Sequence, residues 1–452
     1  MSTIITPRTL SGFMELEPQE QVLFEHIKNV LESTYKSYGF FPIDTPVLEY
    51  SEILLAKAGG ETEKQIYRFN KGDTDLTMRF DLTVPLAKYV AKNQGELSFP
   101  FRRYQIGKVY RGERAQKGRF REFYQADIDI IGDGELSIIN DAEMPSIIYN
   151  VFNKLGIEDF TFRINNRKIL YGLFEMYEFS DKVADILRVI DKFDKIGLEN
   201  VLKELEEIGV GGDAVADIVS LLTMQGTDKE KLAALKEHSG KNELFDTGVE
   251  ELTQVLYYMG KFGVPDKNYR IDLTIARGLD YYTGTVYETT INKHPEIGSV
   301  CSGGRYDNLA AYYTKKQLPG VGMSIGLTRL FYILNEYKYI NEKLKSPIDV
   351  LLIPMTDDMS KAVETAAVIR SSGINIQTYL EDKKFKQKLA YANKLSIPYC
   401  IFIGESEIEN NLLTVKDMNT GEQKSLSIED CISLIKKGID EINSEKCVII
   451  PE

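Results

Sequence analysis

Two stretches rich in aromatic and β-branched residues constrain the fold of this chain most. They cover residues 99–111 and 119–131, and the polar letters GERAQKG lie between them. Two such stretches around a Gly-containing polar segment predict a long β-hairpin. Because a hairpin is an antiparallel pair, the chain must contain an antiparallel sheet.

Further elements are predicted on both sides of this hairpin. Apolar residues after Pro18 recur with helical spacing and the pattern stops at Gly39. The letters FFPIDTPVLEY follow, and their two prolines favour an extended segment at the edge of a sheet over a central strand. The remaining patterns predict strands at 76–80 and 160–165 and helices at 82–94 and about 135–155.

The composition changes from about residue 180 to residue 262. Leu, Ile, Val, Lys and Glu dominate there with helical spacing, and the pattern is interrupted at Gly197. Strand signals resume at 271–291, so the intervening segment is interpreted as a helical insertion. Two Gly-rich segments, up to about residue 340, complete the larger domain.

The end of the chain has a different organisation. After a polar linker at about 340–347, short apolar strands alternate with helices at 358–371 and 384–396, which predicts βαβ units and a small, largely parallel sheet. At roughly 150 residues per domain, 452 residues suggest about three domains. We predict the following domains: 1–179 together with 263–340, 180–262, and 347–452.

Composition excludes several classes of protein. The net charge of -13, from 55 Lys+Arg and 68 Asp+Glu, argues against a nucleic-acid-wrapped protein unless the cations are concentrated locally. Four scattered cysteines and three histidines favour neither a structural zinc site nor Ser-His or Cys-His catalysis. No apolar stretch approaches the roughly 20 residues that span a bilayer, and the N-terminus does not resemble a secretory signal. We therefore expect a cytoplasmic protein with no dedicated metal site.

The strongest chemical signal is the segment 101–121 within the predicted hairpin. It holds eight Lys or Arg residues against one acid, Glu113, which is +7 in an acidic chain. A solvated hairpin surface is the ordinary explanation. However, these arginines alternate with aromatic residues on predicted strands. Arg binds phosphate oxygens through two parallel N–H groups and aromatic rings stack on bases, so a nucleoside triphosphate is a plausible occupant.

Three other segments are weaker when each is taken alone. ARGLDYYTGTVYE (276–288) could be a strand end with a salt bridge, and RFDLT (79–83) could be a helix N-cap. SGGRYDNL (302–309) and GVGMSIGLTRL (320–330) offer glycines for close backbone approach, with Arg305 and Arg329 as candidates to face a substrate. No GxxxxGK[ST] motif is present, which excludes a P-loop as the ATP site.

Together, these segments resemble the histidyl-tRNA synthetase family of class II aminoacyl-tRNA synthetases. TPRTLSGF with residues 42–46 is similar to motif 1, VYRGERAQKGRFREFYQADIDIIG to motif 2, and GVGMSIGLTRL to motif 3. ARGLDYYTGTVYE and SGGRYDNL resemble the two peptides that distinguish the histidine enzymes. KLAYANKLSIPYCIFIG is similar to the anticodon-binding domain of this subgroup. The implied fold is α+β: a class II antiparallel-sheet catalytic domain with a helical insertion, plus a C-terminal α/β anticodon-binding domain.

The resemblance implies a function and roles for the arginines. Such a ligase activates histidine with ATP to histidyl-adenylate and then transfers histidine to the 3′ end of tRNA(His). Arg111 would hold the α-phosphate and Arg329 the γ-phosphate, with Arg119 assisting. Arg277 would lie between the carboxylate of histidine and the α-phosphate, and Arg277 and Arg111 are thus the catalytic residues. Phe123 would stack on adenine and Glu113 would meet its exocyclic amine.

The resemblance also implies how histidine is bound. Asp81, Thr83 and Gln125 would surround its α-amino group. Asp129 and Tyr282, with Tyr281 close by, would address the imidazole, because a ring with two nitrogens needs polar partners. Thr328 stands where a Glu often precedes the motif 3 Arg, a departure that weakens the case for ordinary ATP or metal contacts there.

The last predictions concern binding partners and two alternative functions. Mg²⁺ is expected only as a companion of ATP, motif 1 implies a homodimer, and the lysines between 383 and 394 could contact tRNA or simply form a solvated helix face. One rival is a non-catalytic regulatory paralogue that serves in histidine biosynthesis. Another is an ATP-dependent ligase on the same fold that does not use tRNA.

Overall fold

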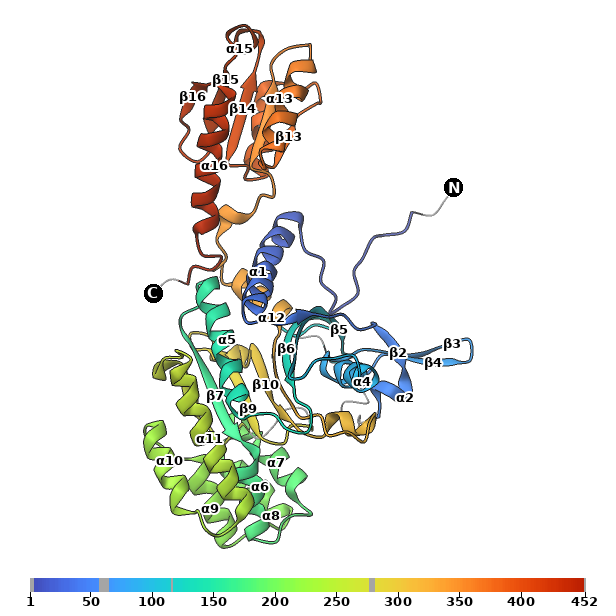
Figure 1. The fold of residues 1–452 in the computed structure, drawn as a ribbon, viewed down its shortest axis with the longest axis vertical. Helices are drawn as coiled ribbons and strands as arrows, with labels where there is room; N and C mark the ends of the chain where they lie inside the picture. Colours follow the sequence, from blue (N-terminus) through green and yellow to red (C-terminus); the bar gives the residue numbers. More distant parts are fainter. Residues whose placement is uncertain (1–3, 57–64, 115–116, 276–280, 451–452) are drawn as a thin grey trace. The chain divides into compact units, whose positions relative to one another are not determined.

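The computed structural model describes residues 4–56, 65–114, 117–275 and 281–450 (Figure 1). Contacts within the chain divide it into two compact units. The first comprises Met1–Met14, Leu31–Asn153 and Ile157–Ile333, and the second comprises Glu15–Val30, Lys154–Gly156 and Leu334–Glu452.

A large mixed sheet organises the first unit. Among the described residues it has eight strands in the order β1-β5-β6-β11-β10-β9-β7-β8, antiparallel except for the outer pairs β1–β5 and β7–β8. The strands are β1 (Phe41–Pro42), β5 (Phe101–Tyr110), β6 (Glu122–Ile131), β7 (Phe160–Asn166), β8 (Tyr269–Ile271), β9 (Thr285–Ile291), β10 (Cys301–Tyr306) and β11 (Gly320–Ile325).

The predicted hairpin is confirmed. β5 and β6 pair antiparallel over their whole length, from Phe101 opposite Ile131 to Tyr110 opposite Glu122. The Pro-containing segment after Gly39 supplies β1, which lies at the edge of the sheet as expected. A strand that holds proline suits an edge, because proline has no N–H for a second neighbour.

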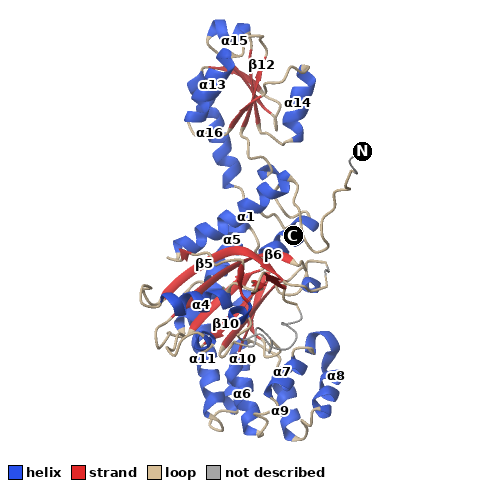
Figure 2. Ribbon diagram, turned by 90° about the vertical axis from the view of Figure 1, so that its right-hand side faces the viewer, coloured by secondary structure: helices blue, strands red, loops and turns tan. Residues whose placement is uncertain are grey.

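The two faces of the sheet differ in chemistry. Successive side chains of a strand point to opposite faces, so Ile128 and Ile130 of β6 share one face and Gln125 and Asp127 share the other. Helix α5 (Ile139–Leu155) covers the apolar face, where Tyr287 donates a hydrogen bond to the carbonyl of Asp141 at 2.6 Å (Figure 2). The polar face is the one that carries the site.

Smaller elements flank this sheet. A three-stranded sheet, β2-β4-β3, leads into helix α4, which begins where RFDLT was interpreted as an N-cap. Helices of the 180–262 segment follow α6, and Gly197 breaks the helical backbone with φ 73°. The bounds are β2 (Leu48–Tyr50), α2 (Ser51–Leu54), β3 (Arg68–Lys71), β4 (Thr74–Met78), α4 (Thr83–Asn93), α6 (Arg167–Met176), α7 (Val183–Ile190), α8 (Phe193–Glu207), α9 (Asp213–Leu222), α10 (Asp228–Glu237) and α11 (Glu243–Lys261).

The second unit contains a five-stranded sheet in the order β13-β12-β14-β15-β16. β13, β12 and β14 are parallel, as predicted, but β15 and β16 are an antiparallel addition that the sequence analysis did not include. The bounds are β12 (Val350–Pro354), α13 (Ser360–Ser371), β13 (Ile376–Thr378), α14 (Phe385–Lys394), β14 (Tyr399–Ile403), α15 (Glu405–Asn410), β15 (Leu413–Asp417), β16 (Gln423–Leu426) and α16 (Ile428–Ser444). Helices α1 (Pro18–Ser37) and α12 (Leu327–Glu336), like α5, contain residues of both units.

Candidate active site

A pocket of about 460 Å³ opens on the polar face of the large sheet. It is lined by residues from the start of α4, the β5–β6 loop, strands β6, β9, β10 and β11, and α12. Segments that are far apart in sequence therefore meet in one place. Of the site residues predicted from sequence, those that line it are Asp81, Thr83, Arg111, Glu113, Arg119, Phe123, Gln125, Tyr281, Tyr282 and Arg329. Arg277 lies outside the described residues.

Asp81 has two environments, one for each carboxylate oxygen. Its Oδ1 accepts a hydrogen bond from the backbone N–H of Val84 at 3.0 Å, so it caps the first turn of α4. Its Oδ2 is buried and has no hydrogen-bond partner among the described residues. Burial raises the pKa of Asp81 to about 6, although the Val84 N–H and nearby Arg111 oppose this shift. Asp81 can therefore cap helix α4 through Oδ1 and still offer Oδ2 to a substrate, so the two roles suggested by the sequence are compatible.

Gln125 and Tyr281 line the pocket beside Asp81. The Nε2 of Gln125 donates to Ser324 Oγ at 2.8 Å, which leaves its buried Oε1 as an acceptor with no partner in the described part of the chain. Tyr281 is buried and shares a hydrogen bond with Thr83. Burial raises the pKa of Tyr281, so the phenol remains protonated.

Asp129 is placed differently from the other predicted residues. It does not appear in the lining of the pocket. Its carboxylate pairs with Arg103 Nη2 at 2.6 Å and accepts a hydrogen bond from the Tyr306 hydroxyl at 2.6 Å. Its contact with imidazole stays a prediction.

The sequence analysis did not single out Asp127, which does line the pocket. It is 2% exposed, and its Oδ1 has no hydrogen-bond partner in the described ranges. Burial raises the pKa of Asp127 to about 7, against the effect of Arg103. The alternation of side chains along the predicted strand 119–131 could have identified it, because residues 125, 127 and 129 must share one face.

Arginines gather at the other part of the pocket. Arg111 donates through Nε to the carbonyl of Phe80 at 2.9 Å and lies over the ring of Phe123, with 5.3 Å from Cζ to the centroid. Arg329 donates to the carbonyl of Ser299 at 2.8 Å, and burial together with the charge of Arg119 lowers its pKa. Cations held this close together favour an anionic ligand.

Carboxylates accompany these arginines. Glu113 lies 3.7 Å from Arg119 and 4.0 Å from Arg111, and both Glu113 and Glu288 act electrostatically on Arg329. In the described part of the chain, no cluster of three or more His, Cys, Asp or Glu side chains could hold a metal ion. The two glutamates are nevertheless suited to an ion that arrives with its own phosphate ligands.

Thr328 has a local structural role. It is buried, and its Oγ1 accepts a hydrogen bond from the backbone N–H of Tyr124 at 2.8 Å. The hydroxyl therefore holds α12 against the start of β6, close to Phe123.

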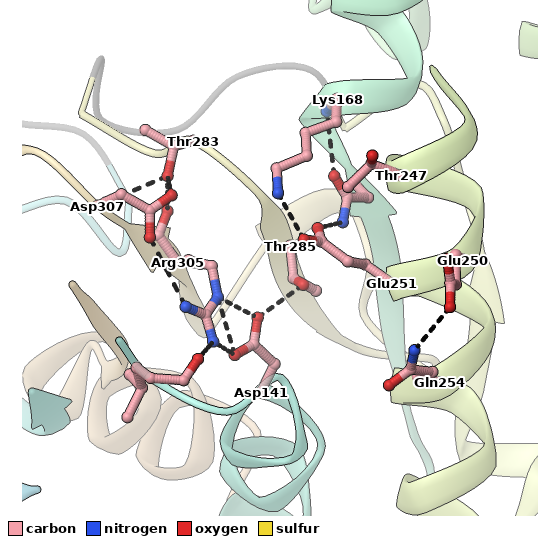
Figure 3. Close-up of polar contacts among 12 residues, drawn as sticks. Asp141, Lys168, Thr247, Glu250, Glu251, Gln254, Thr283, Thr285, Arg305 and Asp307 are labelled. Atoms are coloured by element: carbon pink, nitrogen blue, oxygen red, sulfur yellow. Dashed lines mark hydrogen bonds and ion pairs between the residues drawn. The ribbon is translucent and has the colours of Figure 1, made fainter. Parts of the chain in front are cut away.

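Arg305 does not face the pocket, so that expectation is wrong. It lies next to Gly304, which shares the face of Asp129, and therefore points to the opposite face. There Arg305 Nη2 donates to Asp141 Oδ1 of α5 at 2.6 Å, and Thr285 donates to Asp141 Oδ2 at 2.8 Å (Figure 3). The error arises because successive side chains of a strand point to opposite faces of the sheet, so a residue beside one that faces the pocket points away from it.

The lysine stretch of the second unit is also not uniform. Lys383, Lys384 and Lys386 are exposed, whereas Lys388 is 7% exposed. The Lys388 ammonium donates to the carbonyl of Pro354 at 3.2 Å and lies over the ring of Tyr379. Lys388 thus stabilises its own domain and is removed from the candidate RNA contacts. None of the helices in the described residues is both long and apolar enough to cross a membrane.

Two family models match separate ranges of the chain. Residues 12–330 match the family model described as "Histidyl-tRNA synthetase", and residues 349–438 match "Anticodon binding domain". A "Histidine--tRNA ligase" of Clostridium tetani is 57% identical over 434 residues, which is 96% of this chain and 99% of that protein. The crystal structure of histidyl-tRNA synthetase from Nostoc sp. has a TM-score of 0.88 at 38% identity, covering 96% of this chain and 100% of that one.

A more distant structure shares the fold alone. It is a chain from Bacillus halodurans named "ATP phosphoribosyltransferase regulatory subunit/histidyl-tRNA synthetase", with a TM-score of 0.72 at 20% identity, covering 89% of this chain and 99% of that one. The fold and the family matches define the class of protein as an aminoacyl-tRNA synthetase. Within that class, the chain belongs to the histidyl-tRNA synthetase family.

Proposed function

We propose that this chain activates histidine with ATP and transfers it to the 3′ end of tRNA(His), acting as a histidine-charging ligase in the cytoplasm. Family membership supports the reaction. One observation supports the site: buried oxygens without partners among the described residues, on Asp81, Gln125 and Asp127, line the same pocket as Arg111 and Arg329. A ligand that is cationic at one end and anionic at the other satisfies both sets.

The first step needs positioning more than a strong base. A carboxylate oxygen of histidine attacks the α-phosphorus of ATP, the bond from that phosphorus to the bridging oxygen breaks, and pyrophosphate leaves with the electron pair. Stabilising charge on the α-phosphate and aligning the reactants lower the barrier. Arg111 would hold the α-phosphate, with Arg277 between it and the carboxylate. Arg329 would hold the γ-phosphate, assisted by Arg119.

The other contacts follow from the lining of the pocket. Phe123, over whose ring Arg111 lies, would stack on adenine, and Glu113 would accept from the exocyclic amine. Asp81, Thr83 and Gln125 would take the α-ammonium group. Tyr282, with Tyr281 beside it at 5.0 Å between ring centroids, would contact the imidazole. Mg²⁺ would enter with ATP as part of the substrate, near Glu113 and Glu288.

In the second step, a terminal ribose hydroxyl of the tRNA attacks the acyl carbon of the adenylate and AMP leaves. We propose that the domain 347–452 binds the anticodon part of this tRNA, with Lys383, Lys384, Lys386 and Lys394 as exposed cations. The match of residues 349–438 supports this assignment. The segment 180–262 is proposed as a separate insertion between the two parts of the catalytic domain, 1–179 and 263–340.

A homodimer is proposed for the assembled enzyme. Exposed apolar side chains on β1, β2 and β3 support it: Phe41, Leu48, Tyr50 and Phe69. Exposed apolar residues on edge strands are a feature of protein interfaces. Light scattering should give twice the mass of 51.4 kDa, and Phe41→Asp should shift the protein towards the monomer.

Amino-acid-dependent exchange of pyrophosphate into ATP tests the proposed function. Of the twenty amino acids, histidine alone should support exchange. Arg111→Ala should lower this exchange by about 100-fold or more, since it removes charge stabilisation in the transition state. The matched control is Arg188→Ala on α7, an exposed arginine outside the pocket, which should exchange normally. Exchange with a different amino acid, or none with histidine, would contradict the proposal.

A further inference from the structure

We propose that the turn formed by residues 10–13 positions the β5–β6 loop for ATP, and that it acts through Arg121. This loop carries Arg111, Glu113 and Arg119 into the pocket. The inference rests on the proposed function and deepens it. It gives a role in the ATP site to a segment that the sequence analysis connected only with the dimer.

The turn has a backbone geometry that requires glycine. A hydrogen bond from the backbone N–H of Phe13 to the carbonyl of Leu10, at 3.1 Å, closes the turn. Gly12 is its third residue and has φ +84°, a left-handed conformation that residues with a Cβ rarely adopt.

The turn contacts the end of the loop, where β6 begins. The carbonyl of Gly12 accepts hydrogen bonds from the backbone N–H groups of Arg121 at 2.7 Å and Glu122 at 3.3 Å. A Cβ atom at Gly12 would lie only 2.8 Å from Cγ of Arg121. Glycine is therefore required at this position twice, for its positive φ and for the close approach of Arg121.

The side chain of Arg121 connects the turn to the opposite limb of the loop. Its Nε donates to the carbonyl of Glu113 at 3.0 Å, and its Nη1 donates to the carbonyl of Ser11 at 3.4 Å. Its own carbonyl accepts from the backbone N–H of Arg111 at 2.9 Å. One guanidinium group thus joins the turn to the main chain of Glu113.

Glu113 is the residue through which these contacts reach the pocket. Its carboxylate lines the pocket and lies 3.7 Å from Arg119 and 4.0 Å from Arg111. The backbone N–H of the preceding residue, Gly112, donates to the carbonyl of Gln65 at 2.6 Å. The main chain at Glu113 is therefore held on two sides, by Gln65 and by the turn.

This support matters because the loop extends beyond the sheet. The last strand pair joins Tyr110 to Glu122, so residues 111–121 lie outside the ladder of β5 and β6. Ordering such residues costs conformational entropy, and a loop that is ordered before ATP arrives does not lose that free energy from binding. None of the residues proposed to contact histidine lies in 111–121, so the turn should affect the binding of ATP selectively.

Hydrogen exchange followed by mass spectrometry tests the positioning without depending on activity. In Gly12→Ala and in Arg121→Ala, the hydrogen-bonded amides of Arg111 and Gly112 should exchange about 10-fold faster, because the base of the loop opens more often. Amides of β10 and β11 should keep their rates. The matched control is Gly240→Ala between α10 and α11: Gly240 has φ +83° and nothing within 4 Å of its Cβ position, so the change strains the backbone equally but displaces no neighbour.

Pyrophosphate exchange tests what the positioning does for the reaction. Gly12→Ala and Arg121→Ala should each raise KM for ATP by about 10-fold and leave KM for histidine within about twofold. The double variant should raise KM for ATP no further than the stronger single variant, because the second change removes a contact that is already lost. Arg121→Lys keeps one cationic donor and should recover part of the effect, whereas Gly240→Ala should leave both KM values unchanged.

The two measurements distinguish failure of the inference from failure of the proposed function. The inference is wrong if the amides of the loop keep their exchange rates in Gly12→Ala and Arg121→Ala. It is also wrong if KM rises equally for both substrates, or if the two single effects multiply in the double variant. If the unmodified chain shows no histidine-dependent exchange, the proposed function fails, and the hydrogen-exchange rates still decide whether the turn orders the loop. If Arg121→Ala does not fold, Arg121→Gln is measured in its place.

Discussion

The buried pair between Arg305 and Asp141 provides a sharp prediction, because the sequence suggested a substrate contact and the structure shows a structural one. Arg305 reaches both oxygens of Asp141, at 2.6 Å to Oδ1 and 3.1 Å to Oδ2. It also donates to the carbonyls of Leu136 and Ser137 at 3.1 and 3.3 Å. The Arg305 side chain is 7% exposed and that of Asp141 is fully buried.

Arg305→Ala should therefore lower the free energy of unfolding by about 3–5 kcal/mol, the cost of leaving a buried charge without its partner. In a double-mutant cycle, Arg305→Ala and Asp141→Ala together should cost about 2–3 kcal/mol less than the sum of the two single changes. Urea unfolding followed by far-ultraviolet circular dichroism measures this, since the chain has no tryptophan.

An exposed pair in the same unit is the matched control. Arg188 Nη1 lies 2.7 Å from Asp185 Oδ1 on α7, but these side chains are 62% and 53% exposed. Its coupling energy should be at most about 0.5 kcal/mol, because water screens the charges. The reasoning is refuted if Arg305→Ala destabilises no more than Arg188→Ala, or if it raises KM for histidine or ATP while the free energy of unfolding is unchanged.

Three further predictions concern the site and the RNA. Phe123→Ala should raise KM for ATP by about 10- to 100-fold, the value of one base-stacking contact, and leave KM for histidine within about twofold in pyrophosphate exchange; equal effects on both would contradict stacking. Replacing Lys383 and Lys386 by Ala should weaken tRNA binding and reduce its log–log salt slope by about 2, while exchange stays normal; an unchanged slope would exclude these contacts. Without substrates, the free energy of unfolding should fall as pH rises from about 4 to about 7, because burial raises the pKa of Asp81 and Asp127 above the unfolded value and the folded state alone holds their protons in this range; Asp127→Asn should flatten this fall in urea titrations, and an unaltered slope would argue against it.

Sequence patterns predicted the elements better than the directions of side chains. The hairpin β5–β6 was predictable because its aromatic and β-branched residues are local signals, as was the break at Gly197. Strands β15 and β16 were not included, since LLTVKD and QKSL are short and lie in a largely polar stretch. Their place in the sheet depends on pairing with β14, which is a long-range contact.

For the candidate site as well, the sequence predicted which residues take part better than it predicted their contacts. The motifs identified four residues that lie in one pocket: Asp81, Arg111, Phe123 and Gln125. The partners of Asp129, in contrast, could not be predicted from the motif. The pairing of Arg103 with Asp129 comes from the register of β5 and β6, and a motif gives the letters of two strands without giving their register.

The most direct test of the proposed function is aminoacylation of tRNA(His) by the purified, full-length chain with ATP and labelled histidine. We predict that label accumulates on the tRNA 3′ end in a histidine-dependent and ATP-dependent manner, and that the Arg277→Ala variant, folded by circular dichroism, forms no charged tRNA. Exchange of pyrophosphate without any charging of tRNA would identify a ligase that does not use tRNA. Neither exchange nor charging would identify a non-catalytic relative and contradict the function proposed for this pocket.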